Sequence, residues 1–188
     1  MTAPLYLFVG RIASGKETQG RLVAEMLGCE VFTTGAKFRE IIASGTALGE
    51  RIKADYEKGL LMPSWVADYF FEDFVFNLPT EKSAVFEGSG RDLDQAQVVE
   101  KVCTWLGRPY TVVHLVVSEE EVIRRALARK RDVLDNDESV VRARLKQYDE
   151  NTAPAIEYFK NLGRVIEVDG ERSVEDIHAD IAAKLALK

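Results

Sequence analysis

A glycine-bounded loop, from Gly10 to Lys16, constrains this chain more than any other feature. The residues before it, 5–9, are apolar and end at Gly10, as a buried central strand would. From Lys16 to Leu27, apolar residues recur at helical spacing. A loop in this position can turn its backbone N–H groups inward, and the following helix adds the positive end of its dipole. The segment predicts a phosphate-binding loop.

The loop also carries side chains suited to a nucleoside triphosphate. Lys16 would reach the β- and γ-phosphates as a mobile point charge, and Thr18 would offer a hydroxyl to Mg²⁺. Glu17 separates these two residues, so the plain GxxxxGK[ST] pattern is not met. A chance glycine-rich turn is the alternative. If the loop binds ATP, the residues in contact are Gly10, Ala13, Ser14, Gly15, Lys16, Glu17 and Thr18.

Strands and helices alternate along the rest of the chain. Further strands are expected at residues 30–33, 83–87, 110–117 and 165–168, with helical patterns between them and no hairpin signals. One long helix is expected to end near Leu162. This alternation predicts an α/β fold with a parallel sheet covered on both faces, in a single domain of residues 1–188. Such sheets bind ligands at the carboxyl ends of their strands.

Composition narrows the class of partner and the compartment. The net charge of −6 argues against non-specific binding to nucleic acid or to a membrane surface. No apolar segment approaches the roughly 18 residues of a membrane span. Cys29 and Cys103 lack the spacing of a zinc site or a disulfide framework. We therefore expect a cytoplasmic monomer that binds small molecules and neither nucleic acid nor membranes.

Two arginines follow the second and third expected strands. An acceptor monophosphate carries close to two negative charges, and the planar guanidinium groups of Arg39 and Arg91 could bind it bidentately and fix its attacking oxygen. For each arginine taken alone, a solvated surface charge is the alternative.

A second group of basic residues flanks the acidic stretch 132–137. Arg125 and Arg129 are four residues apart on one helical pattern, where like charges repel slightly in water. A polyphosphate between such groups would remove this cost, and arginines of this kind stabilise the charge of a phosphoryl group in transfer. A solvated, salt-bridged helix pair is the alternative. The basic residues of the two helical segments are Arg124, Arg125, Arg129, Arg131, Arg142 and Arg144.

Taken together, these motifs resemble the adenylate kinase family of nucleoside monophosphate kinases. Residues 18–19 continue the loop as the family does, residues 33–39 (TTGAKFR) resemble its STGDxxR segment, and residues 87–91 (EGSGR) resemble its DGFPR motif. Similarity extends to residues 151–159 and 168–170, so it covers nearly the whole chain. The resemblance implies a P-loop NTPase fold with a five-stranded parallel sheet, a helical NMP-binding lobe at 34–63 and a short lid at 129–138.

The resemblance also implies roles for individual residues. Catalysis would depend on Lys16, Arg91, Arg125, Arg129 and Arg144. ATP would additionally contact Arg125, Arg129 and Arg172, while Mg²⁺ would be held by Thr18 and Glu87, through water. The AMP site would contain Thr34, Gly35, Arg39, Met62, Gly88, Arg91, Gln95, Arg131 and Arg144. Thr34 favours AMP over pyrimidine nucleotides, because relatives that prefer UMP or CMP tend to carry alanine there.

The implied activity is reversible phosphoryl transfer from MgATP to AMP, giving two ADP. One alternative is a kinase for another acceptor, such as UMP, CMP, GMP or a deoxynucleotide. Another is a catalytically weak nucleotide-binding protein, which the departures from the family pattern favour. The departures are Ala13, Glu17, Ala36, Glu87, Ser89 and Gly90, whereas the basic residues expected at the site are all retained.

Several conspicuous residues are assigned to the structure and not to the site. His114 lies in an apolar strand pattern, and this reaction needs no strong general base. The aromatic residues Trp65, Tyr69, Phe70, Phe71 and Trp105 are expected in the core.

Overall fold

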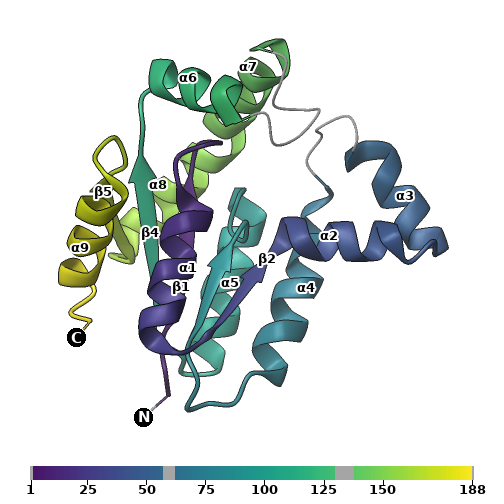
Figure 1. Ribbon diagram of the computed structural model, residues 1–188. Coiled ribbons are helices and arrows are strands. Elements are labelled where there is room, and N and C mark those ends of the chain that lie inside the picture. The colour runs from purple at the N-terminus through teal and green to yellow at the C-terminus, as the bar shows by residue number, and fades with distance from the viewer. Residues whose placement is uncertain (1, 57–61, 130–137, 188) are drawn as a thin grey trace.

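The computed structural model describes residues 2–56, 62–129 and 138–187 (Figure 1). Part of the expected NMP-binding lobe, 57–61, lies outside these residues. So does most of the expected lid, including Arg131, and the side chain of Arg129.

Five parallel strands form one sheet in the order β2-β3-β1-β4-β5, which confirms the predicted fold class. β1 lies in the middle and pairs with β3 on one side and β4 on the other. Its Leu5 is level with both Ala84 and Tyr110, so the strand ends are aligned. The strands are β1 Leu5–Gly10, β2 Glu30–Thr33, β3 Ala84–Glu87, β4 Tyr110–Val116 and β5 Val165–Asp169.

Side chains of β1 alternate between two apolar cores, as the period of a strand dictates. Leu5 and Leu7 belong to the core that includes α4, α5 and α8, whereas Tyr6 and Phe8 belong to the core that includes α1 and α9. Helices therefore cover both faces of the sheet (Figure 1). The helices of these layers are α1 Lys16–Leu27, α4 Ser64–Asn77, α5 Leu93–Trp105, α8 Ala153–Asn161 and α9 Val174–Lys184.

Two helix pairs project beyond these layers. α2 Thr34–Ala43 and α3 Ala47–Tyr56 extend to one side of the sheet, and α6 Glu119–Arg129 and α7 Glu138–Gln147 lie over the end of β4 (Figure 1). α2 and α3 pack closely at Gly49, where an added Cβ would lie 2.3 Å from the carbonyl oxygen of Ile41. Among the helices of the described chain, none is both long and apolar enough to cross a membrane.

The long helix expected before Leu162 is interrupted. Helical structure runs from α7 into α8, but its hydrogen-bonding widens to a π-helical turn, η2, over Tyr148–Thr152. Pro154 lies in the first turn of α8, which continues directly from η2, so its missing N–H interrupts the helical hydrogen bonding here. Short π-helical segments occur often at functional sites, and the uninterrupted helix expected from the sequence did not include this one.

The expectation that all five aromatic residues are buried was wrong. Phe70 and Phe71 are buried on the inner face of α4, but Trp65, Tyr69 and Trp105 are 68%, 60% and 80% exposed. The run of aromatic residues in α4 goes around the helix, so only part of it can face the sheet.

Candidate active site

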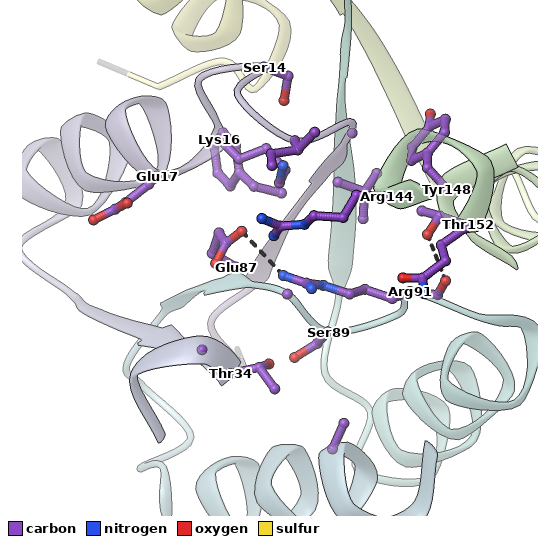
Figure 2. A pocket seen from close by; sticks show the side chains of 18 of the residues that line it. Ser14, Lys16, Glu17, Thr34, Glu87, Ser89, Arg91, Arg144, Tyr148 and Thr152 are labelled. Carbon is purple, nitrogen blue, oxygen red and sulfur yellow. Dashed lines mark hydrogen bonds and ion pairs between the residues drawn. The ribbon is translucent and has the colours of Figure 1, made fainter. Parts of the chain in front are cut away.

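A cleft of about 320 Å³ opens at the carboxyl ends of β1 and β3. It is lined by the loop before α1, the start of α2, the loop between β3 and α5, and the region around η2. Figure 2 shows Lys16, Glu87, Arg91 and Arg144 directed into this space. The position agrees with the expectation that a parallel sheet binds ligands at this edge.

The phosphate loop has the backbone that its glycines predict. Gly10 has φ 145°, and a Cβ there would lie 2.6 Å from the carbonyl oxygen of Leu115. Gly15 is the N-cap of α1, with φ 95°. Ala13, where the related family has glycine, also has a positive φ of 56°. An alanine tolerates this conformation at a cost of about 1 kcal/mol, so the loop keeps its shape despite the substitution.

Three hydroxyl groups beside the cleft are buried without a hydrogen-bond partner among the described residues. They belong to Ser14, Thr34 and Ser89, which are at most 4% exposed. A buried polar group left unpaired costs about 1–3 kcal/mol. Because all three residues line the same cleft, their hydroxyls suit a polar ligand with donors and acceptors at several points.

The loop after β3 holds Arg91 at the cleft. Gly88 has φ 95°, and a Cβ there would lie 2.8 Å from a guanidinium nitrogen of Arg91. The Arg91 guanidinium forms an ion pair with Glu87 at 3.6 Å (Figure 2). The backbone carbonyl of Arg91 accepts a hydrogen bond from the Thr152 hydroxyl at 2.8 Å. A Cβ on Gly90 would press on the ring of Phe159 at 3.1 Å.

Gln95 lines the cleft, but its amide already supports the Arg91 loop. Its side-chain oxygen accepts from the Arg91 N–H at 3.0 Å, and its nitrogen donates to Asp92 at 2.8 Å. Asp92 is in turn the N-cap of α5 and accepts from the backbone N–H of Gln95. One amide hydrogen stays available, so adenine recognition by Gln95 remains a prediction.

The side of the cleft next to α2 is lined by apolar and aromatic side chains. Phe38, Tyr56, Met62 and Ala67 line it together with Thr34 and Gly35. Arg39 also lines this part and donates a hydrogen bond to the Tyr56 hydroxyl at 3.2 Å. An apolar wall next to a guanidinium suits a flat base that carries a phosphate.

Three expected ATP or metal residues do not line this cleft. Thr18 is exposed on α1. The Arg125 guanidinium donates hydrogen bonds to Glu121 at 2.6 Å and to the Gly170 carbonyl at 2.8 Å. Hydrogen bonds from Arg124 and Arg125 lower the pKa of Glu121 to about 2. Arg172 donates to Asp180 at 2.6 Å. Their proposed contacts with ATP stay predictions.

Several residues of the site were missed from the sequence. Arg11 reaches from the phosphate loop to Tyr148 and Asp149, and Tyr148 and Thr152 line the cleft. The two contacts of Arg11 join residues more than 130 positions apart in the sequence, and no spacing rule connects such residues. His114, which was expected to be structural, is hydrogen-bonded to Tyr148 and Glu167.

The carboxylate of Glu87 fits a magnesium ion that is bound together with a nucleotide. It lies at the end of β3, in the same cleft as Lys16, with its side chain 17% exposed. Within the described chain, no group of three or more His, Cys, Asp and Glu residues could hold a metal by itself. Mg²⁺ usually needs only one or two carboxylates, because waters and phosphates supply its other ligands.

A parallel sheet in this order, a phosphate loop after its central strand and an arginine-bearing loop after the neighbouring strand define a P-loop nucleoside monophosphate kinase. A family model described as "Adenylate kinase" matches residues 8–164. The chain belongs to the adenylate kinase family. The expected kinase class, with ATP and Mg²⁺ as its cofactors, is thereby confirmed at the level of the family.

Curated relatives match nearly the whole chain. Adenylate kinase 1 of Synechocystis sp. is 33% identical over 176 residues, which are 93% of each chain. An adenylate kinase of Thermus thermophilus is 34% identical over 187 residues and covers 96% of both chains. That of Archaeoglobus fulgidus is 29% identical over 95% of this chain and 96% of its own length.

Proposed function

We propose that this protein transfers the γ-phosphoryl group of MgATP to AMP, reversibly, and so forms two ADP. The observation that carries the proposal is one cleft that joins the phosphate loop to the Arg91 loop, with Arg144 directed between them (Figure 2). Two phosphate-binding loops on one cleft suit a transfer between two nucleotides. A protein that only hydrolysed ATP would need no second loop of this kind.

In this proposal the residues of the cleft act by position and charge. The backbone N–H groups of the phosphate loop and Lys16 hold the β- and γ-phosphates. Arg91 and Arg39 bind the phosphate of AMP and direct its oxygen at the γ-phosphorus. Arg144 stabilises the negative charge that is spread over the transferred group, as Arg125 and Arg129 would from α6. Mg²⁺ near Glu87 would neutralise further phosphate charge.

Thr34 supports AMP as the acceptor. Its hydroxyl is buried at the start of α2 and has no hydrogen-bond partner among the described residues, and it lies beside the apolar wall where a base would lie. A base that pairs with this hydroxyl is favoured over one that leaves it unsatisfied. Other nucleoside monophosphates are the main alternative, and they differ from AMP in the edge that they present here.

The finer organisation remains a prediction. It comprises the NMP-binding lobe at 34–63, the short lid at 129–138, a monomeric state and a cytoplasmic location. The lid would exclude water, so that the acceptor oxygen attacks and hydrolysis is avoided. Size-exclusion chromatography with light scattering tests the monomer, for which the expected mass is 21.1 kDa.

A coupled assay of ADP formation tests the activity. MgATP is supplied with AMP, UMP, CMP, GMP or dAMP in turn, and Lys16→Ala serves as the inactive control. We expect turnover with AMP to exceed that with every other acceptor. Faster turnover with another nucleotide would make that nucleotide the acceptor. Measurable ATP binding without turnover on any of the five would identify a nucleotide-binding protein instead.

A further inference from the structure

The side chain of Arg11 leaves the phosphate loop and lies against the π-helical turn η2. One guanidinium nitrogen donates to the carbonyl of Val117, just beyond β4, at 3.1 Å. The second terminal nitrogen, Nη2, lies 3.3 Å from the carboxylate of Asp149. The guanidinium carbon lies 5.4 Å from the centre of the Tyr148 ring. Arg11 thus has contacts with two successive residues of the turn and with the residue that follows β4.

The turn η2 is itself tied to other parts of the cleft. The Tyr148 hydroxyl is hydrogen-bonded to His114 of β4 at 2.9 Å. Thr152, at the other end of the turn, donates to the carbonyl of Arg91 at 2.8 Å. The turn also follows directly after α7, which carries Arg144 into the cleft (Figure 2). The turn η2 therefore connects the phosphate loop, the Arg91 loop and α7, the helix that carries Arg144.

Arg11 also contacts the lysine of the loop. Its carbonyl oxygen accepts a hydrogen bond from the Lys16 ammonium group at 2.7 Å. Any shift of Arg11 relative to η2 would therefore move the backbone that faces Lys16. Since phosphoryl transfer depends on placing charged groups to within a fraction of an ångström, such a shift would slow the reaction.

We propose that Arg11 is a positioning residue that fixes the phosphate loop against η2, and so sets the place of Lys16 relative to Arg91 and Arg144. The effect on turnover rests on the proposed kinase activity, whereas the coupling of the two segments does not. Arg11 acts through its neighbours and does not touch the reacting atoms.

Arg11→Met is the variant that tests the proposal. Methionine keeps an apolar stem of similar width but loses the charge and the planar donors. It also removes the Nε of Arg11, which is buried without a partner among the described residues. The loss of the ion pair is therefore partly offset in stability, and the variant is expected to fold. Tyr148→Leu removes the other partner of the contact.

Hydrogen exchange, followed by mass spectrometry without nucleotide, tests the coupling. In Arg11→Met we expect faster exchange in both segments, residues 10–16 and 148–152. Tyr148→Leu should give the same pattern, and the double variant should exchange little faster than either one. Unchanged exchange, or faster exchange in only the mutated segment, would overturn the proposal. This readout stands even if the protein proved to have no kinase activity.

Kinetics then test the consequence for turnover. We expect Arg11→Met to lower kcat about tenfold, with KM for ATP changed less than threefold. Arg11→Lys should recover part of the loss, because it restores the charge but not the planar contact. Arg164→Met, which removes a similar cation–π contact with Tyr110 at 5.0 Å before β5, outside the cleft, serves as the control and should keep kcat. A large rise in KM with unchanged kcat would mean that Arg11 binds phosphate directly, and would contradict positioning.

Discussion

The carboxylate of Glu17 lies 2.8 Å from the guanidinium of Arg21, one turn further along α1. Glu17 belongs to the lining of the cleft, but Figure 2 shows its carboxylate directed away from Lys16. The negative charge that departs from the family pattern is thus turned along the helix, toward a positive one. A negative residue in the first turn is also favoured by the helix dipole. Glu17 is therefore compatible with a functional phosphate loop.

This relationship predicts that Glu17→Gln leaves ATP affinity within about twofold of the wild type. An exposed pair of this type contributes only about 0.3–0.5 kcal/mol, so stability should also change little. Titration with a fluorescent ATP analogue measures the affinity, and Lys16→Ala shows what the loss of a true phosphate ligand does. A loss of more than tenfold in the glutamine variant would assign Glu17 a direct part in binding.

Gly88→Ala should impair the acceptor side specifically. The new Cβ would lie 2.8 Å from the Arg91 guanidinium and 3.2 Å from Thr34, at a φ of 95°. We expect KM for AMP to rise at least tenfold, while KM for ATP stays within threefold. Steady-state kinetics with each substrate varied in turn measure both values.

Gly107→Ala is the matched control for backbone strain. Gly107 also has a positive φ, of 60°, but a Cβ there meets nothing within 4 Å. It should lose about 1 kcal/mol of stability and keep both KM values. If the two variants had the same kinetics, the crowding at Arg91 would be irrelevant to AMP binding.

Asp68→Asn should stabilise the protein at neutral pH. Burial, and then the nearby Asp92, Glu72 and Asp94, raise the pKa of Asp68 to about 6. The folded state therefore binds more protons than the unfolded state between about pH 4 and 6, and stability falls as pH rises through this window.

Because Asp68 is only partly buried, we expect a gain of about 1 kcal/mol at pH 7.5 and almost none at pH 4. Urea unfolding at both pH values measures it. Glu25→Gln, at an exposed position of α1, is the control for removing one carboxylate. An equal gain at both pH values would exclude the ionisation of Asp68 as the cause.

Arg108→Met should reduce stability without changing the kinetics of the folded enzyme. Arg108 is 4% exposed and donates hydrogen bonds to the carbonyls of Ala3, Leu78, Pro79 and Lys82. Its removal leaves buried carbonyls without their donors, so we expect a loss of about 2–4 kcal/mol in urea unfolding. Arg108 precedes β4, at the end of the sheet opposite the cleft, so kcat should be retained. A lower kcat would contradict this prediction and would show that packing around Arg108 affects the cleft at the opposite end of the sheet.

The sequence was sufficient for the sheet and for the phosphate loop. Short apolar runs that alternate with helical patterns predicted all five strands, because a buried parallel strand has few other ways to appear in a sequence. The shape of the loop was likewise predicted, since Gly10 and Gly15 adopt a backbone that other residues seldom adopt.

The tertiary structure alone decided how the side chains of the site are held. Gln95 supports the Arg91 loop, Arg125 is bound to Glu121 and Gly170, and Arg11 contacts a turn more than 130 residues away. Helical spacing could not distinguish the buried Phe71 from the exposed Tyr69 either. Local sequence determines backbone conformation and apolar period, because these depend on near neighbours. Which charged partner a side chain contacts depends on how distant segments pack, and only the folded chain brings those segments together.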